Sequence, residues 1–188
     1  MADWDENGIQ RRVAGAHDFR LDGVADILAR ARGTSVLDLG CNRGMVCVEF
    51  KNYGASVLHG CDIWEPGIKV AREIFADMRQ VESKFEVADL TKGDEALNPF
   101  LPRYDIVVML ATYHKIKREM DDHKLTQLVK NIGTRTGQYF VWRGPSDAKE
   151  ANEEKSRLDR ELADVGLGRV HTSTLSKTIG MAAIWERK

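Results

Sequence analysis

Short apolar runs recur along this chain and predict its strands. Five of them stand out, at residues 35–39, 55–63, 84–90, 104–110 and 138–144. The run at 104–110, YDIVVML, is apolar without alternation. A strand of that kind is buried on both faces, so we expect it at the centre of a sheet.

Amphipathic stretches separate these runs and predict helices. In the first, Val24, Ile27 and Leu28 share one face and Gly33 is a stop signal. The predicted helices cover residues 22–33, 44–54, 65–78, 119–133 and 146–166.

The last segment, residues 168–188, differs because it holds two strands and only a short turn, which predicts a hairpin. The whole pattern predicts an α/β fold: a doubly wound, mostly parallel seven-stranded sheet with a C-terminal antiparallel hairpin and helices on both faces. We expect a single domain over residues 1–188, with a polar lead-in at 1–21, an N-terminal helix at 22–33 and a core at 34–188.

Composition narrows the functional classes only slightly. The 28 basic and 29 acidic residues leave a net charge of −1, so nothing global indicates nucleic acid or an anionic membrane. The acidic N-terminus lacks an apolar secretion signal, and no apolar run is long enough to span a membrane. Cys41, Cys47 and Cys61 lie in apolar segments without CxxC spacing. We therefore expect reduced core thiols in a cytoplasmic protein, and no metal site.

The stretch SVLDLGCNRG, residues 35–44, is a strand that runs into a glycine-rich turn. Gly40 allows the backbone to approach a ligand closely, and Gly44 opens the next helix. The turn matches neither the G-x-G-x-x-G pattern of dinucleotide sites nor the G-K-S/T pattern of phosphate loops. Asp38 would repel a phosphate and suits a cationic ligand.

This turn resembles the first motif of the class I S-adenosylmethionine-dependent methyltransferases, D/E-x-G-x-G-x-G. Asp38, Gly40 and Gly44 match it, and Asn42 takes the place of the middle glycine. The resemblance covers roughly residues 33–188 and implies S-adenosyl-L-methionine as cofactor, whose sulfonium and ammonium suit an acidic turn.

The resemblance also implies roles for residues at the next strand ends. Asp62 would bind the two ribose hydroxyls, and Ile63 would lie against the adenine. Asp89 would accept from the adenine amino group, with the Leu90 backbone nearby. Leu110 and Ala111 would pass the amino-acid end of the cofactor with their backbone.

The segment LATYHKIKRE, residues 110–119, takes the family's acceptor-facing position and lacks the N/D-P-P-Y signature of amino-group methylation. His114 is the candidate general base, since an imidazole titrates near neutral pH. The alternative is a histidine that caps or packs beneath the sheet edge. The basic run at 115–118 either faces an anionic acceptor or is a solvated helix start.

Further rim candidates carry weaker signals. Arg20 could meet the cofactor carboxylate, as that region does in the family. Arg143 and the pair at 176–177 lie at rim positions, where a purely structural role is the favoured interpretation. Trp64 and Tyr113 could stack on a flat acceptor, whereas Trp142 is expected in the core.

The predicted function is methyl transfer from S-adenosyl-L-methionine to a hydroxyl of a small-molecule or saccharide-like acceptor, by a monomer or homodimer. One alternative is an RNA methyltransferase that uses the basic residues at 115–118 and 130–143. Another is a non-catalytic cofactor-binding partner protein, which has little need of three acids at three strand ends.

Overall fold

The computed structural model describes residues 18–188, so residues 1–17 of the expected lead-in at 1–21 lie outside the described part. Seven strands form one sheet in the order β3-β2-β1-β4-β5-β7-β6. The strands are β1 (Ser35–Leu39), β2 (Val57–Asp62), β3 (Glu82–Val87), β4 (Tyr104–Leu110), β5 (Thr136–Arg143), β6 (Leu167–Thr172) and β7 (Ala182–Arg187).

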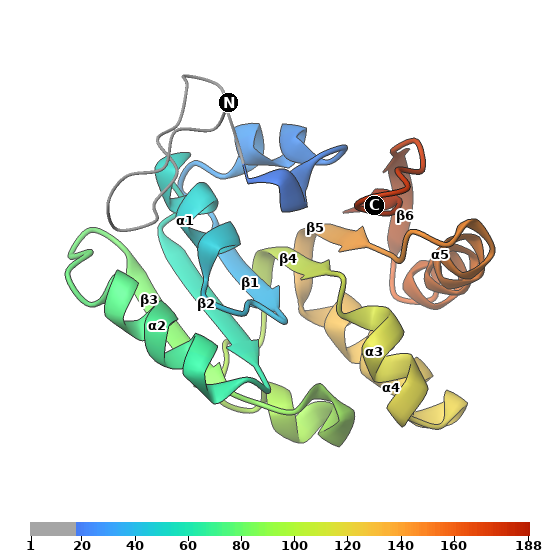
Figure 1. The fold of residues 1–188 in the computed structure, drawn as a ribbon, viewed down its shortest axis with the longest axis horizontal. Helices are drawn as coiled ribbons and strands as arrows, with labels where there is room; N and C mark the ends of the chain where they lie inside the picture. Colours follow the sequence, from blue (N-terminus) through green and yellow to red (C-terminus); the bar gives the residue numbers. More distant parts are fainter. Residues whose placement is uncertain (1–17) are drawn as a thin grey trace.

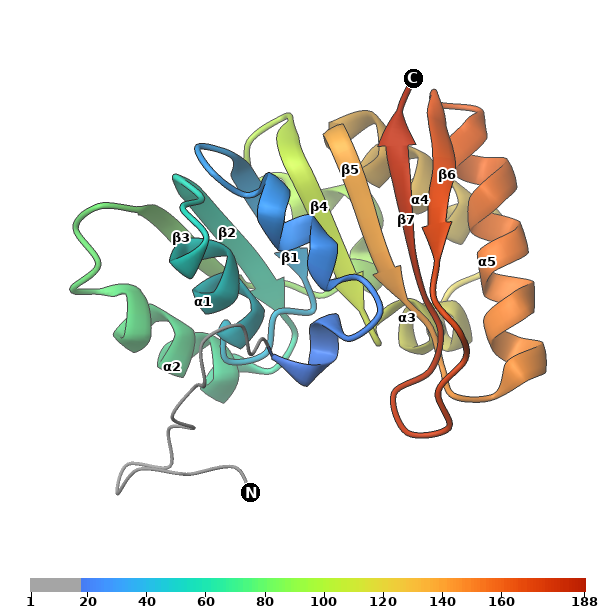
Figure 2. The same cartoon turned by 90° about the horizontal axis from the view of Figure 1, so that it is seen from above.

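Strands β1 to β5 pair in parallel (Figure 1), while β7 is antiparallel to both β5 and β6 (Figure 2). This confirms the expected mostly parallel sheet with an antiparallel C-terminal hairpin. The apolar strand β4 lies between β1 and β5 at the middle of the sheet, as its unbroken hydrophobic run predicts. The carboxyl ends of the parallel strands therefore share one edge, which we call the carboxyl edge.

Helices cover both faces of the sheet, as expected for a doubly wound fold (Figure 2). The α-helices are α1 (Met45–Asn52), α2 (Glu65–Phe75), α3 (Tyr113–Glu119), α4 (Asp122–Arg135) and α5 (Ala148–Ala163). The 3-10 helices are η1 (Phe19–Leu21), η2 (Ala25–Arg30) and η3 (Leu90–Leu97). One core joins the sheet to α1, α2, η1 and η2, and the other joins it to α3, α4, α5 and η3.

The helix predicted at 22–33 is shorter in the structure, where the 3-10 helix η2 covers Ala25–Arg30 and the 3-10 helix η1 precedes the segment. The predicted apolar face is buried, since Val24, Ile27 and Leu28 all pack into the core. The start of this segment is held by distant side chains, and Gly23 has a φ of 81°. The carbonyl of Asp22 accepts from Arg143, and that of Gly23 lies 2.6 Å from Nε2 of His171. Both carbonyls are therefore engaged outside the segment.

The helix predicted at 119–133 has different bounds in the structure, where it is α4. A separate helix, α3, precedes it, and α4 begins only after Asp121, whose carboxylate caps the main-chain N–H of Lys124 at 2.9 Å. The strand predicted at 84–90 ends early, at Val87, because Asp89 caps η3. The hairpin strands are joined by a loop at 173–181, longer than the short turn expected, with a bridge between Ser176 and Gly180.

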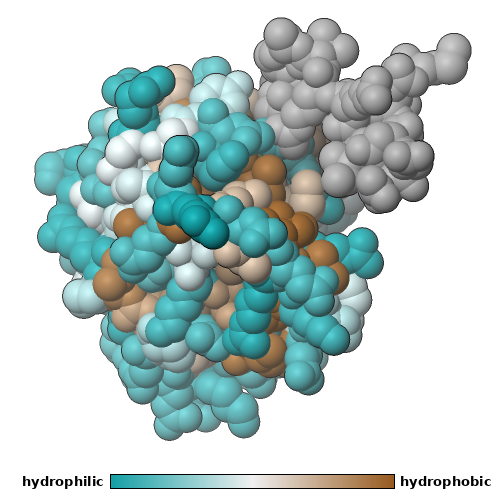
Figure 3. Space-filling model, turned by 90° about the vertical axis from the view of Figure 1, so that its left-hand side faces the viewer, coloured by the Kyte–Doolittle hydropathy of each residue, from teal (hydrophilic) through white to brown (hydrophobic). Residues whose placement is uncertain are grey.

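The surface on the side of β3 and α2 is mostly hydrophilic, with hydrophobic areas between the polar ones (Figure 3). Within residues 18–188, no helix combines the length and apolar character needed to cross a membrane. Cys41, Cys47 and Cys61 are buried free thiols, as expected. Burial raises the pKa of all three thiols, that of Cys61 to about 12, so they are unreactive core groups.

Candidate active site

The glycine turn follows β1 directly and lies at the carboxyl edge. The main-chain N–H groups of Gly40 and Cys41 both donate to the carbonyl of Cys61, at 2.8 and 2.9 Å, which ties the turn to the end of β2. Gly40, Asn42 and Gly44 all have positive φ, at 88°, 52° and 72°. This backbone path favours glycine and tolerates asparagine, which explains why Asn42 can replace a glycine of the motif.

Gly40 also allows the loop after β4 to approach. A Cβ at Gly40 would lie 2.1 Å from Oγ1 of Thr112, far inside contact distance. Thr112 in turn donates from Oγ1 to the carbonyl of Leu110 at 3.1 Å. The turn after β1 and the loop after β4 are thus fitted against each other, and Thr112, which we did not predict, belongs to this edge.

Asp38 lies in β1 and is 3 % exposed. Desolvation raises its pKa to about 7, repulsion from Asp62 adds to the rise, and Arg20 partly offsets it. The Sγ atom of Cys47 lies 3.9 Å from its carboxylate. A buried carboxyl poised near neutral pH becomes fully ionised when a cation comes close, so this site favours a positively charged ligand.

Asp62, the last residue of β2, is joined to the glycine turn. Its Oδ2 accepts from the main-chain N–H of Asn42 at 2.8 Å, and its Oδ1 accepts from that of Trp64 at 2.9 Å. A carboxylate has about four lone-pair sites, so two further donors can still bind it. The predicted pairing of this acid with ribose hydroxyls is chemically compatible with these contacts and stays a prediction.

Two exposed apolar side chains lie beside Asp62, at the ends of the neighbouring strands β2 and β3. Ile63 is 67 % exposed, and Val87, which pairs with Asp62 in register, is 46 % exposed. Large apolar side chains left open beside polar groups are typical of a ligand site. Val87 was not predicted, although its place two residues before Asp89 is the signal that would have found it.

Asp89 is the third predicted acid and follows the end of β3. Its Oδ1 accepts from the main-chain N–H of Thr91 at 3.0 Å and from the Thr91 hydroxyl at 2.7 Å, so it caps η3. Leu90 packs its side chain into the core, which leaves only its backbone for the predicted contact. Asp38 near the end of β1, Asp62 at the end of β2 and Asp89 just after β3 therefore lie along one edge, as predicted, and their ligand roles stay predictions.

Leu110 ends β4 at the same edge, and Ala111 follows it. Ala111 has a φ of 55°, an unusual conformation for a non-glycine residue, and its N–H donates to the carbonyl of Arg143 at 2.9 Å. Leu110 is buried while Ala111 is exposed. Strained, small and exposed backbone at a strand end suits close approach of a ligand, which is the role the family resemblance implies.

His114 is the second residue of α3 and is half-buried. Burial lowers its pKa, and the charges of Lys115 and Arg118 lower it further, with Glu150 opposing them. Its buried Nδ1 has no hydrogen-bond partner among the described residues. A neutral imidazole with a free ring nitrogen can accept a proton. That His114 takes the proton of the methyl acceptor's hydroxyl stays a prediction.

The aromatic candidates divide clearly. Tyr113 is buried in the core on the α4–α5 side, so its predicted stacking on an acceptor is wrong. Trp142 lies in the core, as expected. Trp64 is exposed enough to contact a ligand, and Arg43 of the glycine turn stacks over its ring, with the guanidinium carbon 5.4 Å from the ring centroid.

The basic candidate residues differ in their exposure and in the groups that they bind. Arg20 pairs with Asp18 through a 2.7 Å ion pair. Arg118 pairs with Glu150 at 3.4 Å, and Lys115 is exposed. Arg143 is only 4 % exposed and binds main-chain carbonyls, which agrees with the structural interpretation of that residue.

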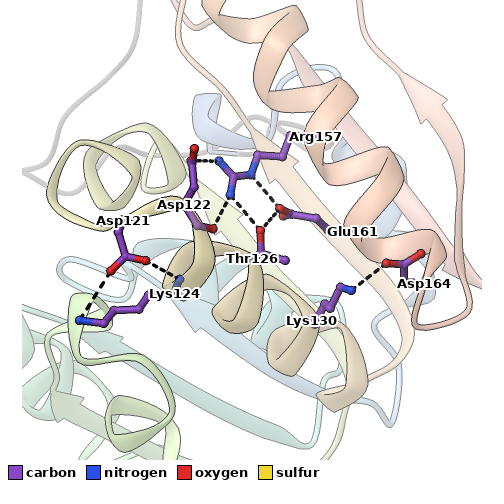
Figure 4. Close-up of polar contacts among 8 residues, drawn as sticks. All are labelled: Asp121, Asp122, Lys124, Thr126, Lys130, Arg157, Glu161 and Asp164. Atoms are coloured by element: carbon purple, nitrogen blue, oxygen red, sulfur yellow. Dashed lines mark hydrogen bonds and ion pairs between the residues drawn. The ribbon is translucent and has the colours of Figure 1, made fainter.

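A surface hollow of about 740 Å³ lies elsewhere, between α4 and α5. Several of its charged side chains pair with one another: Arg157 binds Asp122 at 2.6 Å and Glu161 at 2.7 Å, and Lys130 binds Asp164 at 2.8 Å (Figure 4). No strand end lines it. Within residues 18–188, no cluster of three or more acidic, histidine or cysteine side chains could hold a metal ion.

Comparison with known proteins agrees with this geometry. A family model described as a methyltransferase domain matches residues 36–133. The ubiquinone biosynthesis O-methyltransferase of Alkalilimnicola ehrlichii is 32 % identical over 134 residues, which are 69 % of this chain and 51 % of that protein. The chain thus spans about half the length of this relative.

Two solved structures share the fold at low sequence identity. A TehB-like S-adenosylmethionine-dependent methyltransferase from Corynebacterium glutamicum superimposes with a TM-score of 0.65 at 18 % identity, over 93 % of this chain and 91 % of that one. Magnesium protoporphyrin IX methyltransferase from Synechocystis, solved with bound S-adenosylmethionine, gives 0.63 at 16 % identity, over 93 % and 86 %.

Proposed function

The chain belongs to the methyltransferase-domain family of class I S-adenosylmethionine-dependent enzymes, and we propose that it transfers a methyl group to a hydroxyl of a small-molecule or saccharide-like acceptor. The observation that carries this proposal is the row of Asp38, Asp62 and Asp89 along one sheet edge, with the glycine turn at its start. The 32 % identical relative is an O-methyltransferase, which supports an oxygen acceptor.

The residues at the carboxyl edge suit the cofactor part by part. Asp62 would accept the ribose hydroxyls, and the exposed Ile63 and Val87 would flank the adenine. Asp89 would accept from the adenine amino group. Asp38 would lie toward the cationic amino-acid end, because a buried carboxyl with a raised pKa gains most from a nearby positive charge.

S-adenosylmethionine supplies an activated methyl group on a sulfonium, so the protein's main task is to align the acceptor oxygen. Alignment of this kind is worth roughly 7–11 kcal/mol of the barrier. His114 would take the hydroxyl proton on a ring nitrogen. Its lowered pKa keeps the imidazole neutral, and therefore ready to accept a proton, at physiological pH.

A thermal-shift titration tests the cofactor part of the proposal. At about 100 times the dissociation constant, S-adenosylhomocysteine stabilises by roughly 2.7 kcal/mol, which for a chain of this length raises Tm by roughly 5–10 °C. NAD and ATP should leave Tm unchanged. Equal shifts with NAD would contradict the assignment of the turn.

The acceptor part needs a product assay. The protein is incubated with S-adenosylmethionine and separate pools of small hydroxyl compounds, saccharides and RNA, and each pool is searched by mass spectrometry for products heavier by one methylene. We expect products among the small hydroxyl compounds or saccharides. Products confined to the RNA pool, with strongly salt-dependent binding, would favour the RNA methyltransferase instead. Cofactor binding without any product would favour a non-catalytic partner protein.

The RNA alternative draws on the exposed Lys115 and Arg118 of α3, although Arg118 already pairs with Glu150. We further propose a cytoplasmic protein, since three buried free thiols suit a reducing compartment. A monomer or a homodimer is proposed as its assembly. Sedimentation of the purified chain distinguishes these two states.

A further inference from the structure

Arg143 ends β5 at the carboxyl edge, between two neighbouring strands. In register it faces Leu110, the last residue of β4, and Ala182, the first residue of β7. Its side chain is almost wholly buried, at 4 % exposure. The end of β5 is therefore occupied by a buried cation beside the candidate site.

The guanidinium of Arg143 joins two segments that are distant in sequence. Its Nε donates to the carbonyl of Arg20 at 2.8 Å, and Nη2 donates to the carbonyl of Asp22. Its Nη1 donates to the carbonyl of Ile179, in the hairpin loop, at 2.9 Å. Figure 2 shows both segments, residues 18–22 and the loop at 173–181, at the carboxyl edge of the sheet.

Burial of the Arg143 guanidinium lowers its pKa. A neutral side chain at this position would carry a smaller desolvation cost on folding. The nearby Asp22 and Asp18 offset only part of that effect. A planar fork of donors that reaches three carbonyls at once specifies geometry, which a point charge such as lysine cannot reproduce. The arrangement is thus better suited to placing backbone than to adding stability.

The segment held by Arg143 approaches the candidate cofactor site. Asp18 caps η1 by accepting from the N–H of Arg20 at 2.9 Å, and its own N–H donates to Glu49 of α1 at 3.0 Å. The charges of Arg20 and Asp18 both act on the carboxyl of Asp38. Moving residues 18–22 would therefore change the electrostatic environment at the end of β1.

We propose that Arg143 is a positioning residue that holds residues 18–22 and the hairpin loop together as one wall of the cofactor and acceptor cleft. The role rests on the proposed function. Arg143 contacts neither ligand in this scheme and acts through the backbone that it binds.

The chain offers a matched control in Arg187, the last residue of β7. Its guanidinium also donates to three main-chain carbonyls, those of Gly133, Thr136 and Val165. Because β7 runs antiparallel to β5, Arg187 lies at the opposite edge of the sheet. Arg187→Lys therefore removes the same kind of contact far from the candidate site.

The test compares Arg143→Lys with Arg187→Lys by calorimetry and thermal unfolding. We expect both variants to lose stability, and only Arg143→Lys to weaken S-adenosylhomocysteine binding, by about tenfold or more. Equal affinities for the wild type and Arg143→Lys, at a temperature where both are folded, would overturn the positioning role.

Limited trypsin digestion tests, without any ligand, whether Arg143 holds residues 18–22 in place. Trypsin cuts after Arg20, whose carbonyl is the one that Nε of Arg143 holds. We expect the fragment that begins at Leu21 to appear about tenfold faster in Arg143→Lys than in Arg187→Lys, because local opening exposes that bond. An unchanged cleavage rate would overturn the positioning role of Arg143. Failure of the wild type to bind S-adenosylhomocysteine would count against the proposed function alone.

If Arg143→Lys does not fold, hydrogen exchange on the wild-type chain tests the proposal instead. The N–H groups of Leu21 and Gly180 are hydrogen-bonded in the two held segments. We expect their opening free energies to match, because one side chain holds both segments. Exchange that differs by more than about tenfold in protection would overturn the proposal.

Discussion

The main-chain N–H of Asn42 donates a 2.8 Å hydrogen bond to Oδ2 of Asp62, 20 residues farther along the chain. This bond joins the glycine turn after β1 to the acid at the end of β2. It places the two strongest sequence signals of the chain in direct contact. The geometry of the predicted ribose site therefore depends on both strands at once.

Asp62→Ala removes an acceptor for two main-chain donors and for the predicted ribose hydroxyls. A hydrogen bond to a charged group is worth about 1.5–3 kcal/mol, so we expect the Kd of S-adenosylhomocysteine to rise at least about tenfold. Calorimetry measures the change. Asp26→Ala, at an exposed acid of η2, is the control and should bind normally. An unchanged Kd in Asp62→Ala would move the ribose site elsewhere.

Asp38 makes the stability of the ligand-free protein depend on pH. Its pKa is raised from 3.8 to about 7, so between these values the folded chain keeps a proton that the unfolded chain has lost. The free energy of unfolding should therefore fall as pH rises through this window, by at most about 1.4 kcal/mol per pH unit. Asp38→Asn should remove this contribution.

Urea unfolding of the wild type and Asp38→Asn across that pH window measures the difference. Glu154, whose pKa burial also raises to about 7, titrates in both proteins and cancels in the comparison. Asp26→Asn serves as the exposed-acid control. Parallel stability curves for the wild type and Asp38→Asn would show that Asp38 does not titrate as described.

His114→Ala tests the proposed base. Turnover of a hydroxyl acceptor should fall by roughly 10²–10⁴, while cofactor affinity and Tm change little. The wild-type rate should rise with pH through an imidazole pKa below its usual value and then flatten, because only the neutral ring accepts a proton. His123→Ala, at an exposed histidine of α4, is the control. Full activity of His114→Ala would leave alignment as the main catalytic contribution.

Gly40→Ala tests the close fit between the glycine turn and Thr112. Both Gly40 and Gly33 have positive φ, but a Cβ at Gly33 would meet nothing within 4 Å. Gly33→Ala should therefore cost only the backbone strain, roughly 1–2 kcal/mol, and Gly40→Ala more. Adding Thr112→Ala to Gly40→Ala should recover part of the excess in urea unfolding. Equal losses of unfolding free energy in the two single variants would mean that the loop after β4 moves aside without measurable cost.

Much of the architecture could be predicted from the order of apolar runs. Alternating strands and helices dictate a parallel sheet, and the unbroken run of β4 dictates a central position, because only a strand covered on both faces buries such a run. The shared edge of Asp38, Asp62 and Asp89 follows from the same logic, since parallel strands end on one side. The family motif added the cofactor to that pattern.

Contacts between distant segments decided what the sequence could not. Residues 22–33 have a helical apolar spacing, yet the carbonyls of Asp22 and Gly23 contact Arg143 and His171, and only the shorter 3-10 helix η2 forms. Tyr113 and His114 are neighbours in sequence, but packing against α4 and α5 turns Tyr113 into the core and leaves His114 half-buried. Local pattern determines periodicity, whereas the direction of a side chain beyond a strand end is determined by what packs against it. The burial of Arg143 against three carbonyls is therefore a property of the tertiary structure alone.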